Sequence, residues 1–97
     1  MSLPVVFRRA ARDEFDNAAM WYEERQPGLG LQFAEEIMRA AELVAKDPER
    51  YPAKHDSIRC IQVRRFPYSV FYRHEQRRIV VLAVFHARRD PMMWRSR

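Results

Sequence analysis

The sequence predicts a small α+β domain with the element order β-α-α-β-β-β, in which a helical hairpin packs on one face of a small antiparallel sheet. Two segments with helical spacing of apolar residues fill the first half of the chain, and both glycines of the sequence lie between them. After Asp56 the spacing changes from about 3.6 residues to about 2, which is typical of strands. The 97 residues are enough for one domain, which we expect to span residues 1–97.

The first half of the chain is expected to form one short strand and two helices. Val5 to Arg8 is typical of a short strand, and the segment from Gln26 to Gly30 should be the turn between the helices. Asp47-Pro48 ends the second helix. The apolar residues at helical spacing are Phe15, Ala18, Ala19 and Tyr22 in the first helix and Phe33, Ile37, Ala40, Ala41 and Val44 in the second. Acidic residues are expected to form solvated faces on the helices, and these are Glu23, Glu24, Glu35, Glu36 and Glu42.

The second half of the chain should contain a loop and three strands. Glu49 to Asp56 is expected to be the loop, because Pro48 and Pro52 disfavour regular structure. The strands are expected at Ile58 to Arg65, Tyr68 to His74 and Arg78 to Phe85, and their short connections require an antiparallel meander. Both faces of the last run are apolar, which predicts a central strand covered on both sides. The position of the first strand in the sheet stays open.

One face of the sheet could remain uncovered by the helices. Tyr68, Val70 and Tyr72 should share one face of their strand, with Phe71 on the other. If the helices cover only one side, the remaining apolar side chains form an exposed surface. A bound partner segment laid across that surface is an economical explanation for it.

Composition excludes several classes of protein and of site. No apolar run approaches the roughly 20 residues that span a bilayer, and the start is unlike a signal peptide, so we expect a cytoplasmic protein with no membrane contact. Cys60 is the single cysteine, so it is expected to be a core residue and not part of a disulfide. His55, His74 and His86 are dispersed, so neither a metal nor a cofactor is expected.

Charge is distributed unevenly along the chain. Residues 1–50 hold seven basic against ten acidic side chains, whereas residues 51–97 hold eleven basic against three acidic ones. Arginine dominates the basic half and favours planar, multidentate contacts. At the end of the last strand, His86, Arg88 and Arg89 could grip a phosphate, a carboxylate or a charged protein surface. An acidic protein partner and a nucleic-acid backbone would suit this half equally well.

Several residue patterns together resemble the RelE/ParE superfamily of toxins from bacterial toxin–antitoxin operons. They are the order of the elements, Arg59 near the start of the second strand, the aromatic strand from Pro67 to Arg73, and the ending from Val84 to Pro91 with Trp94 beyond it. The strand PYSVFYR and the ending FHARRDP are more similar to the ParE-like branch, which includes plasmid-stabilisation toxins. This resemblance implies a toxin of a type II toxin–antitoxin system that a cognate antitoxin, ParD-like or similar, neutralises. When free, such a toxin inhibits DNA gyrase without catalysis of its own, and it contacts operator DNA only indirectly, through the antitoxin.

The RelE-like branch, which cuts messenger RNA on the ribosome, is the main alternative. Such an endoribonuclease needs groups that move protons and stabilise a phosphorane. Ser69 occupies the position where RelE-like chains often carry arginine, and no tyrosine follows Tyr72, so no catalytic residue is expected. Under the endoribonuclease alternative, His86 would handle a proton, and Arg64, Arg65 and Arg89 would stabilise the phosphorane. A basic nucleic-acid-binding module without toxin activity is a weaker alternative.

Two surfaces follow from the resemblance. The target-binding surface is expected at the basic end of the sheet and comprises Arg64, Arg65, His86, Arg88 and Arg89. The candidates for antitoxin binding are Arg59, Tyr72, Arg73, Met92, Met93 and Trp94. An acidic, partly helical antitoxin segment would complement these residues. His86 could act in proton transfer, or it could fix the strand end and contact a partner.

Overall fold

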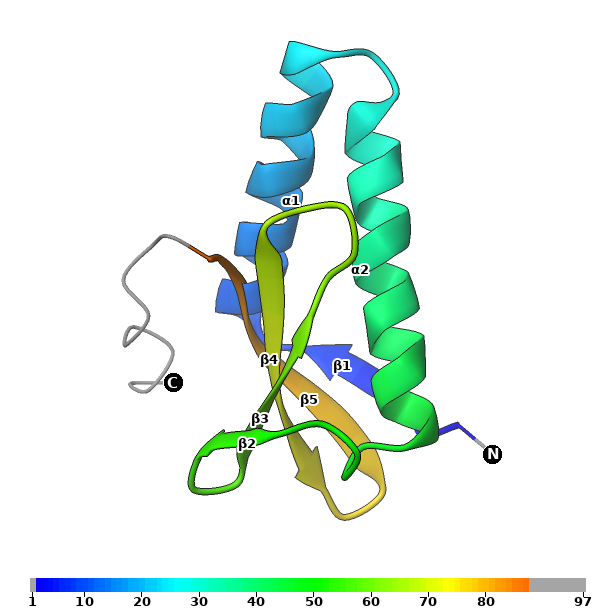
Figure 1. The fold of residues 1–97 in the computed structure, drawn as a ribbon, viewed down its shortest axis with the longest axis vertical. Coiled ribbons are helices and arrows are strands. Elements are labelled where there is room, and N and C mark those ends of the chain that lie inside the picture. The colour runs from blue at the N-terminus through cyan, green and yellow to red at the C-terminus, as the bar shows by residue number, and fades with distance from the viewer. Residues whose placement is uncertain (1, 88–97) are drawn as a thin grey trace.

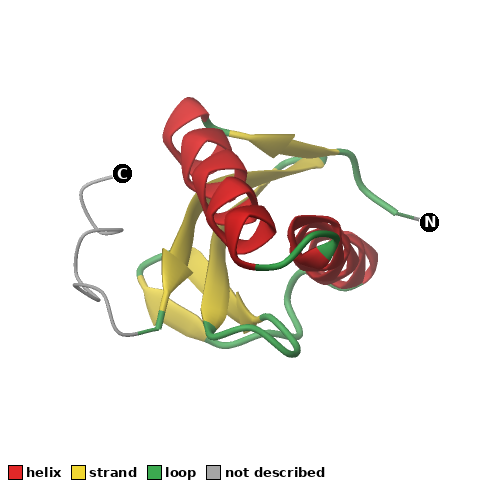
Figure 2. Ribbon diagram, turned by 90° about the horizontal axis from the view of Figure 1, so that it is seen from above, coloured by secondary structure: helices red, strands yellow, loops and turns green. Residues whose placement is uncertain are grey.

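A computed structural model of the chain describes residues 2–87. Its elements are β1 (Val5–Phe7), α1 (Arg9–Arg25), α2 (Leu29–Lys46), β2 (Ala53–His55), β3 (Ile58–Gln62), β4 (Tyr68–Glu75) and β5 (Arg78–His86). The five strands form one sheet in the order β1-β5-β4-β3-β2 (Figure 1). Both helices lie on one side of this sheet (Figure 2). The α+β class and the predicted order of helices and strands are confirmed. No helix within residues 2–87 has the length and apolar character needed to cross a membrane.

The sheet differs from the prediction in two places. It is mixed and not purely antiparallel, because β1 joins β5 in parallel, with Val5 opposite Ile79. The predicted loop from Glu49 to Asp56 is wrong for Ala53–His55, which forms β2 and pairs antiparallel with β3. Both prolines precede β2, so every residue of the short strand keeps its backbone N–H. Asp56 turns the chain back with a φ of 51°.

Strand β5 is the central strand, and its residues Ile79 to Phe85 are all buried. Its register with β4 shifts by one residue, because Phe71 lies opposite Ala83 whereas Tyr72 lies opposite Val81. Leu82 is therefore an extra residue, which defines a β-bulge. As a result Val81 and Val84 both pack in the core under the helices, while Leu82 and Ala83 both pack on the opposite face.

The two faces of the sheet hold separate apolar cores. On the helix side, Tyr68 packs against Phe33 with 5.0 Å between ring centroids, and Tyr22 packs against Phe66 at 4.9 Å. The prediction that Tyr68, Val70 and Tyr72 share one face of their strand is confirmed, and this face is the helix side. The other face buries Ile58, Cys60, Phe71, Val80, Leu82, Ala83 and Phe85. Phe71 and Phe85 are only 8% and 5% exposed, so the predicted exposed aromatic surface is wrong for these residues.

Two of the acidic helix residues have structural partners. The Glu23 carboxylate accepts hydrogen bonds from the backbone N–H groups of Gly28 and Gly30, each at 3.0 Å, and so caps the start of α2. Glu36 is 8% exposed, with the guanidinium groups of Arg39 and Arg65 at 3.6 and 3.8 Å. The expectation of a solvated face is therefore wrong for Glu36, which is buried, whereas Glu23 is exposed as expected and also binds the start of α2.

Residues 48–51, which follow α2, are fastened to the sheet by polar side chains of β3 and β4. The Tyr72 hydroxyl donates to the Pro48 carbonyl at 2.6 Å, and Arg59 Nη1 donates to the Tyr51 carbonyl at 2.6 Å. Burial raises the pKa of the Tyr72 hydroxyl to about 12, against the opposing effect of nearby Arg59. We refer to these contacts of Tyr72 and Arg59 as the loop staple.

Replacing Gly30 by alanine should destabilise the helical hairpin. The added methyl carbon would lie 2.6 Å from the Ala19 carbonyl oxygen, so α1 and α2 would have to separate. We expect Gly30→Ala to lower the free energy of unfolding by about 1–3 kcal/mol in urea denaturation. Leu31→Ala is the control, because Leu31 is 66% exposed and its truncation should change stability by less than about 0.5 kcal/mol. Equal stability of Gly30→Ala and wild type would contradict the close helix approach.

Removing the Tyr72 hydroxyl should change both the stability and its dependence on pH. Tyr72→Phe leaves the Pro48 carbonyl without its donor, at an expected cost of about 1–3 kcal/mol at neutral pH. The raised pKa of Tyr72 contributes stability that is present below about pH 10 and is lost as pH rises toward about 12. Denaturation measured from pH 7 to 11.5 should show a smaller alkaline loss in Tyr72→Phe.

Tyr51→Phe is the matched control, because it removes a hydroxyl from the stapled segment and keeps the Tyr72 bond. This control should retain the alkaline loss of the wild type. Tyr22, whose pKa burial also raises, accounts for an alkaline loss that persists in both variants. An identical pH profile for Tyr72→Phe and wild type would rule out the assigned role of the Tyr72 hydroxyl.

Candidate functional site

The structure brings the β3–β4 loop and the end of β5 to the same end of the sheet. Tyr68 lies opposite His86, and the Ala87 backbone N–H donates to the Pro67 carbonyl at 2.7 Å. Arg64 and Arg65 in this loop therefore lie at the same end as His86. Arg88 and Arg89, which follow directly in the sequence, lie outside the described residues.

Arg65 fastens the β3–β4 loop to α2. Strand β3 ends at Gln62 and not at Arg65 as predicted, and Arg65 adopts a φ of 70°. Its Nη2 donates to Gln32 Oε1 at 2.7 Å, and its Nη1 lies 3.8 Å from Glu36 Oε2. These contacts hold Arg65 in a backbone conformation that residues other than glycine rarely adopt. Arg64 is exposed, so its charge faces solvent and it does not share the structural role of Arg65.

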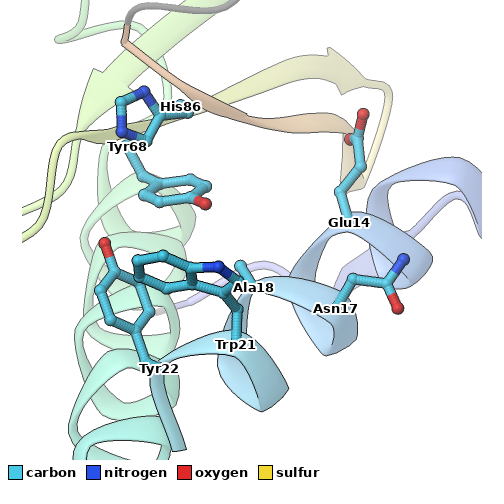
Figure 3. Close-up of a pocket in the computed structure, with 7 residues that line it drawn as sticks. All are labelled: Glu14, Asn17, Ala18, Trp21, Tyr22, Tyr68 and His86. Carbon is cyan, nitrogen blue, oxygen red and sulfur yellow. The ribbon is translucent and has the colours of Figure 1, made fainter. Parts of the chain in front are cut away.

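His86 lines a cavity of about 500 Å³ between α1 and the ends of β4 and β5 (Figure 3). Its ring contacts Tyr68 edge to face, with 5.2 Å between centroids. Among residues 2–87, the other residues of the cavity wall are Glu14, Asn17, Ala18, Trp21 and Tyr22, all from α1. Glu14 Oε1 accepts the backbone N–H of Val84 at 3.0 Å, which attaches α1 to β5 beyond the end of β1.

Sequence reasoning missed the α1 residues of this cavity, although the sequence contains a signal for them. Glu14, Asn17, Ala18 and Trp21 fall at i, i+3, i+4 and i+7, so they form a second stripe along α1 beside the apolar one. A stripe that ends in an exposed tryptophan is a candidate binding surface. Trp21 is 48% exposed.

The residues expected to bind an antitoxin occupy different environments. Tyr72 has no exposed surface, so its assignment to a contact surface is corrected, and Arg59 shares the loop staple with it. Arg73 is partly exposed and its Nη1 lies 3.5 Å from Glu75 Oε2, so it remains accessible to a partner. Arg78 also contacts Glu75, and hydrogen bonding to these arginines lowers the pKa of the Glu75 carboxyl. Met92, Met93 and Trp94 lie outside the described residues.

The histidines of the described chain lie in three separate places. His55 contacts Asp56 at 3.2 Å, His74 contacts Glu49 at 3.2 Å, and His86 lines the cavity. Among residues 2–87 no group of three or more His, Cys, Asp or Glu side chains is arranged to hold a metal ion. Cys60 is buried as expected, and burial raises the pKa of its thiol. The arrangement is suited to binding through arginine, histidine and aromatic groups.

Comparison with known proteins agrees with this geometry. A solved structure described as the chromosomal ParDE TA system from P. aeruginosa has a TM-score of 0.76 and 17% sequence identity, with 88% of this chain and 96% of that chain covered. No curated protein matches the sequence. A family model described as the ParE toxin of type II toxin-antitoxin system, parDE, matches residues 5–91. Because this match includes every described strand and helix, the chain belongs to the ParE toxin family of type II toxin–antitoxin systems.

Proposed function

We propose that this protein is a toxin that a cognate antitoxin neutralises and that inhibits DNA gyrase when free. The observation that carries the proposal is the match of the ParE toxin family to residues 5–91. The proposed target-binding surface is the basic end of the sheet, with Arg64, His86, Arg88 and Arg89, and with Arg65 contributing charge from the β3–β4 loop, where it contacts α2. Gyrase and the antitoxin are cytoplasmic partners, so we propose a cytoplasmic site of action.

The basic half of the chain supports an acidic antitoxin segment as the partner. Its excess of arginine gives the protein a net charge of +5, and Arg73 in β4 stays partly exposed beside Glu75. Complementary charge would speed the encounter and exclude basic competitors. The second face of the sheet does not contribute, because its aromatic residues are buried. The partner contacts are therefore proposed around Arg73 and the sequence that contains Met92, Met93 and Trp94.

The positions of the basic residues favour target binding over RNA cleavage. An endoribonuclease would have to bring a proton-transfer group and arginines to one phosphate. Arg65 is bound to Gln32 and Glu36 on α2, whereas His86 contacts Tyr68 beside α1. These contacts direct the two side chains toward different helices. We therefore propose that the basic end binds its target without catalysing a reaction.

The first experiment distinguishes the two targets. After a pulse of expression without antitoxin, incorporation of labelled thymidine and of labelled leucine is followed over the first minutes. We expect thymidine incorporation to fall first, because gyrase inhibition stops replication. Purified protein should then inhibit supercoiling by gyrase. An earlier collapse of leucine incorporation would place the target on the ribosome, and growth without either defect would reject toxin activity for this chain.

Charge reversal at the basic end should separate toxicity from folding. The double variant Arg88→Glu, Arg89→Glu is expected to lose growth inhibition while it keeps the circular dichroism and melting temperature of the wild type. The matched control is Arg50→Glu, Arg77→Glu, which makes the same change in net charge at exposed positions away from this end. Toxicity that survives in a folded Arg88→Glu, Arg89→Glu protein would move the target-binding surface elsewhere.

A further inference from the structure

The β3–β4 loop carries part of the proposed target-binding surface and is fastened to the sheet at both of its ends. The Val63 backbone N–H donates to the Tyr68 carbonyl at 2.9 Å, and the Pro67 carbonyl accepts the Ala87 backbone N–H at 2.7 Å. The tip of the loop, residues 64–65, lies between these attachments. The direction in which its two arginines project therefore depends on contacts that the tip makes itself.

Arg65 attaches this tip to α2, which runs beside the loop (Figure 1). Its Nη2 donates to Gln32 Oε1 at 2.7 Å, and its Nη1 lies 3.8 Å from Glu36 Oε2. Its guanidinium carbon also lies 5.8 Å from the centre of the buried Phe66 ring. The backbone φ of 70° at Arg65 is strained for a residue with a side chain. Such strain persists where the surroundings determine the conformation, and strained residues gather at functional sites.

Glu36 is a buried carboxylate between two guanidinium groups. Gln32, Glu36 and Arg39 fall at i, i+4 and i+7, so they form one polar stripe along α2. Arg39 Nε lies 3.6 Å from Glu36 Oε1, while Arg65 approaches the other carboxylate oxygen. Glu36 is 8% exposed, and removal of a carboxylate from water costs free energy that an ion pair only partly returns. Arg39 therefore helps to orient the carboxylate that Arg65 contacts.

Local stability does not explain this combination of residues. A glycine in place of Arg65 would adopt a φ of 70° without strain, and an apolar residue in place of Glu36 would avoid the burial of a charge. We propose that Gln32 and Glu36 are positioning residues of the target-binding surface. They act through Arg65, which fixes the loop so that the exposed Arg64 is oriented before the target arrives. A side chain oriented in advance loses less conformational freedom on binding. The inference rests on the proposed function, because it assigns these roles to the basic end of the sheet.

The first measurement follows the loop in the full-length chain and needs no target. The double variant Gln32→Ala, Glu36→Gln removes the amide acceptor and the charge that Arg65 contacts. We expect the backbone order parameters of residues 64–65, measured by ¹⁵N relaxation, to fall from about 0.85 to below about 0.6. The matched control Gln26→Ala, Glu35→Gln makes the same two changes at exposed positions and should keep the order of the wild type.

The second measurement separates a positioning role from a purely structural one. Its readout is the concentration of purified chain that halves supercoiling by gyrase, and Gln32→Ala, Glu36→Gln should raise it about 10-fold. In an Arg64→Gln background the same double change should raise it by less than about twofold, because the loop then has no charge at residue 64 to orient. A purely structural role would give the same factor in both backgrounds, and equal factors would overturn the proposal.

The two measurements distinguish failure of this inference from failure of the proposed function. Order parameters that stay unchanged in the folded double variant would overturn the positioning role, while inhibition by the wild type would still support the proposed function. A wild-type chain that leaves supercoiling unaffected would reject gyrase as the target, and with it the positioning role, even if the loop loses order. If Gln32→Ala, Glu36→Gln does not fold, Gln32→Ala alone is measured by the same criteria, because Gln32 is only half-buried.

Discussion

The fold depends on β5, which is buried on both faces and paired on both edges. It pairs in parallel with β1 and antiparallel with β4, and α1 packs across its helix side. Glu14 extends this attachment by binding the Val84 N–H where β1 has already ended. Because a doubly covered strand tolerates few polar residues, β5 can place functional groups only at its ends. His86 is the last residue of β5, and it lines the cavity beside α1.

The elements and the core could be predicted from sequence because they follow from local periodicity. The apolar stripes of α1 and α2 and the alternation in β4 show directly which side chains face inward. The roles of Glu23, Glu36 and Tyr72 could not be predicted in this way. Each depends on a group in another segment: the start of α2 for Glu23, the β3–β4 loop for Glu36 and the residues after α2 for Tyr72. A charged or hydroxylated side chain does not reveal from sequence alone whether its partner is water or distant backbone.

The candidate site could be predicted only in part, because local sequence patterns show where basic residues lie but not which groups they contact. The ending of β5 and the basic loop before β4 are strong sequence features, and the structure brings them to one end of the sheet. The sequence did not show that the arginines of this loop have different roles. Arg65 is used to hold a strained loop against α2, whereas Arg64 faces solvent. Membership of the ParE toxin family gives the biological context, and the structure shows which charged side chains also stabilise the fold.

The bulge at Leu82 determines on which face of the sheet the side chains of the following β5 residues lie. In a regular strand, Val81, Ala83 and Phe85 would point toward the helices, and His86 would point away from them. The extra residue reverses this parity, so Val84 and His86 share the helix side with Val81, and His86 reaches the cavity. Evolution can therefore vary the side chains of this strand more readily than its length. Loss of one residue there would exchange the two faces of the strand end while leaving its composition almost unchanged.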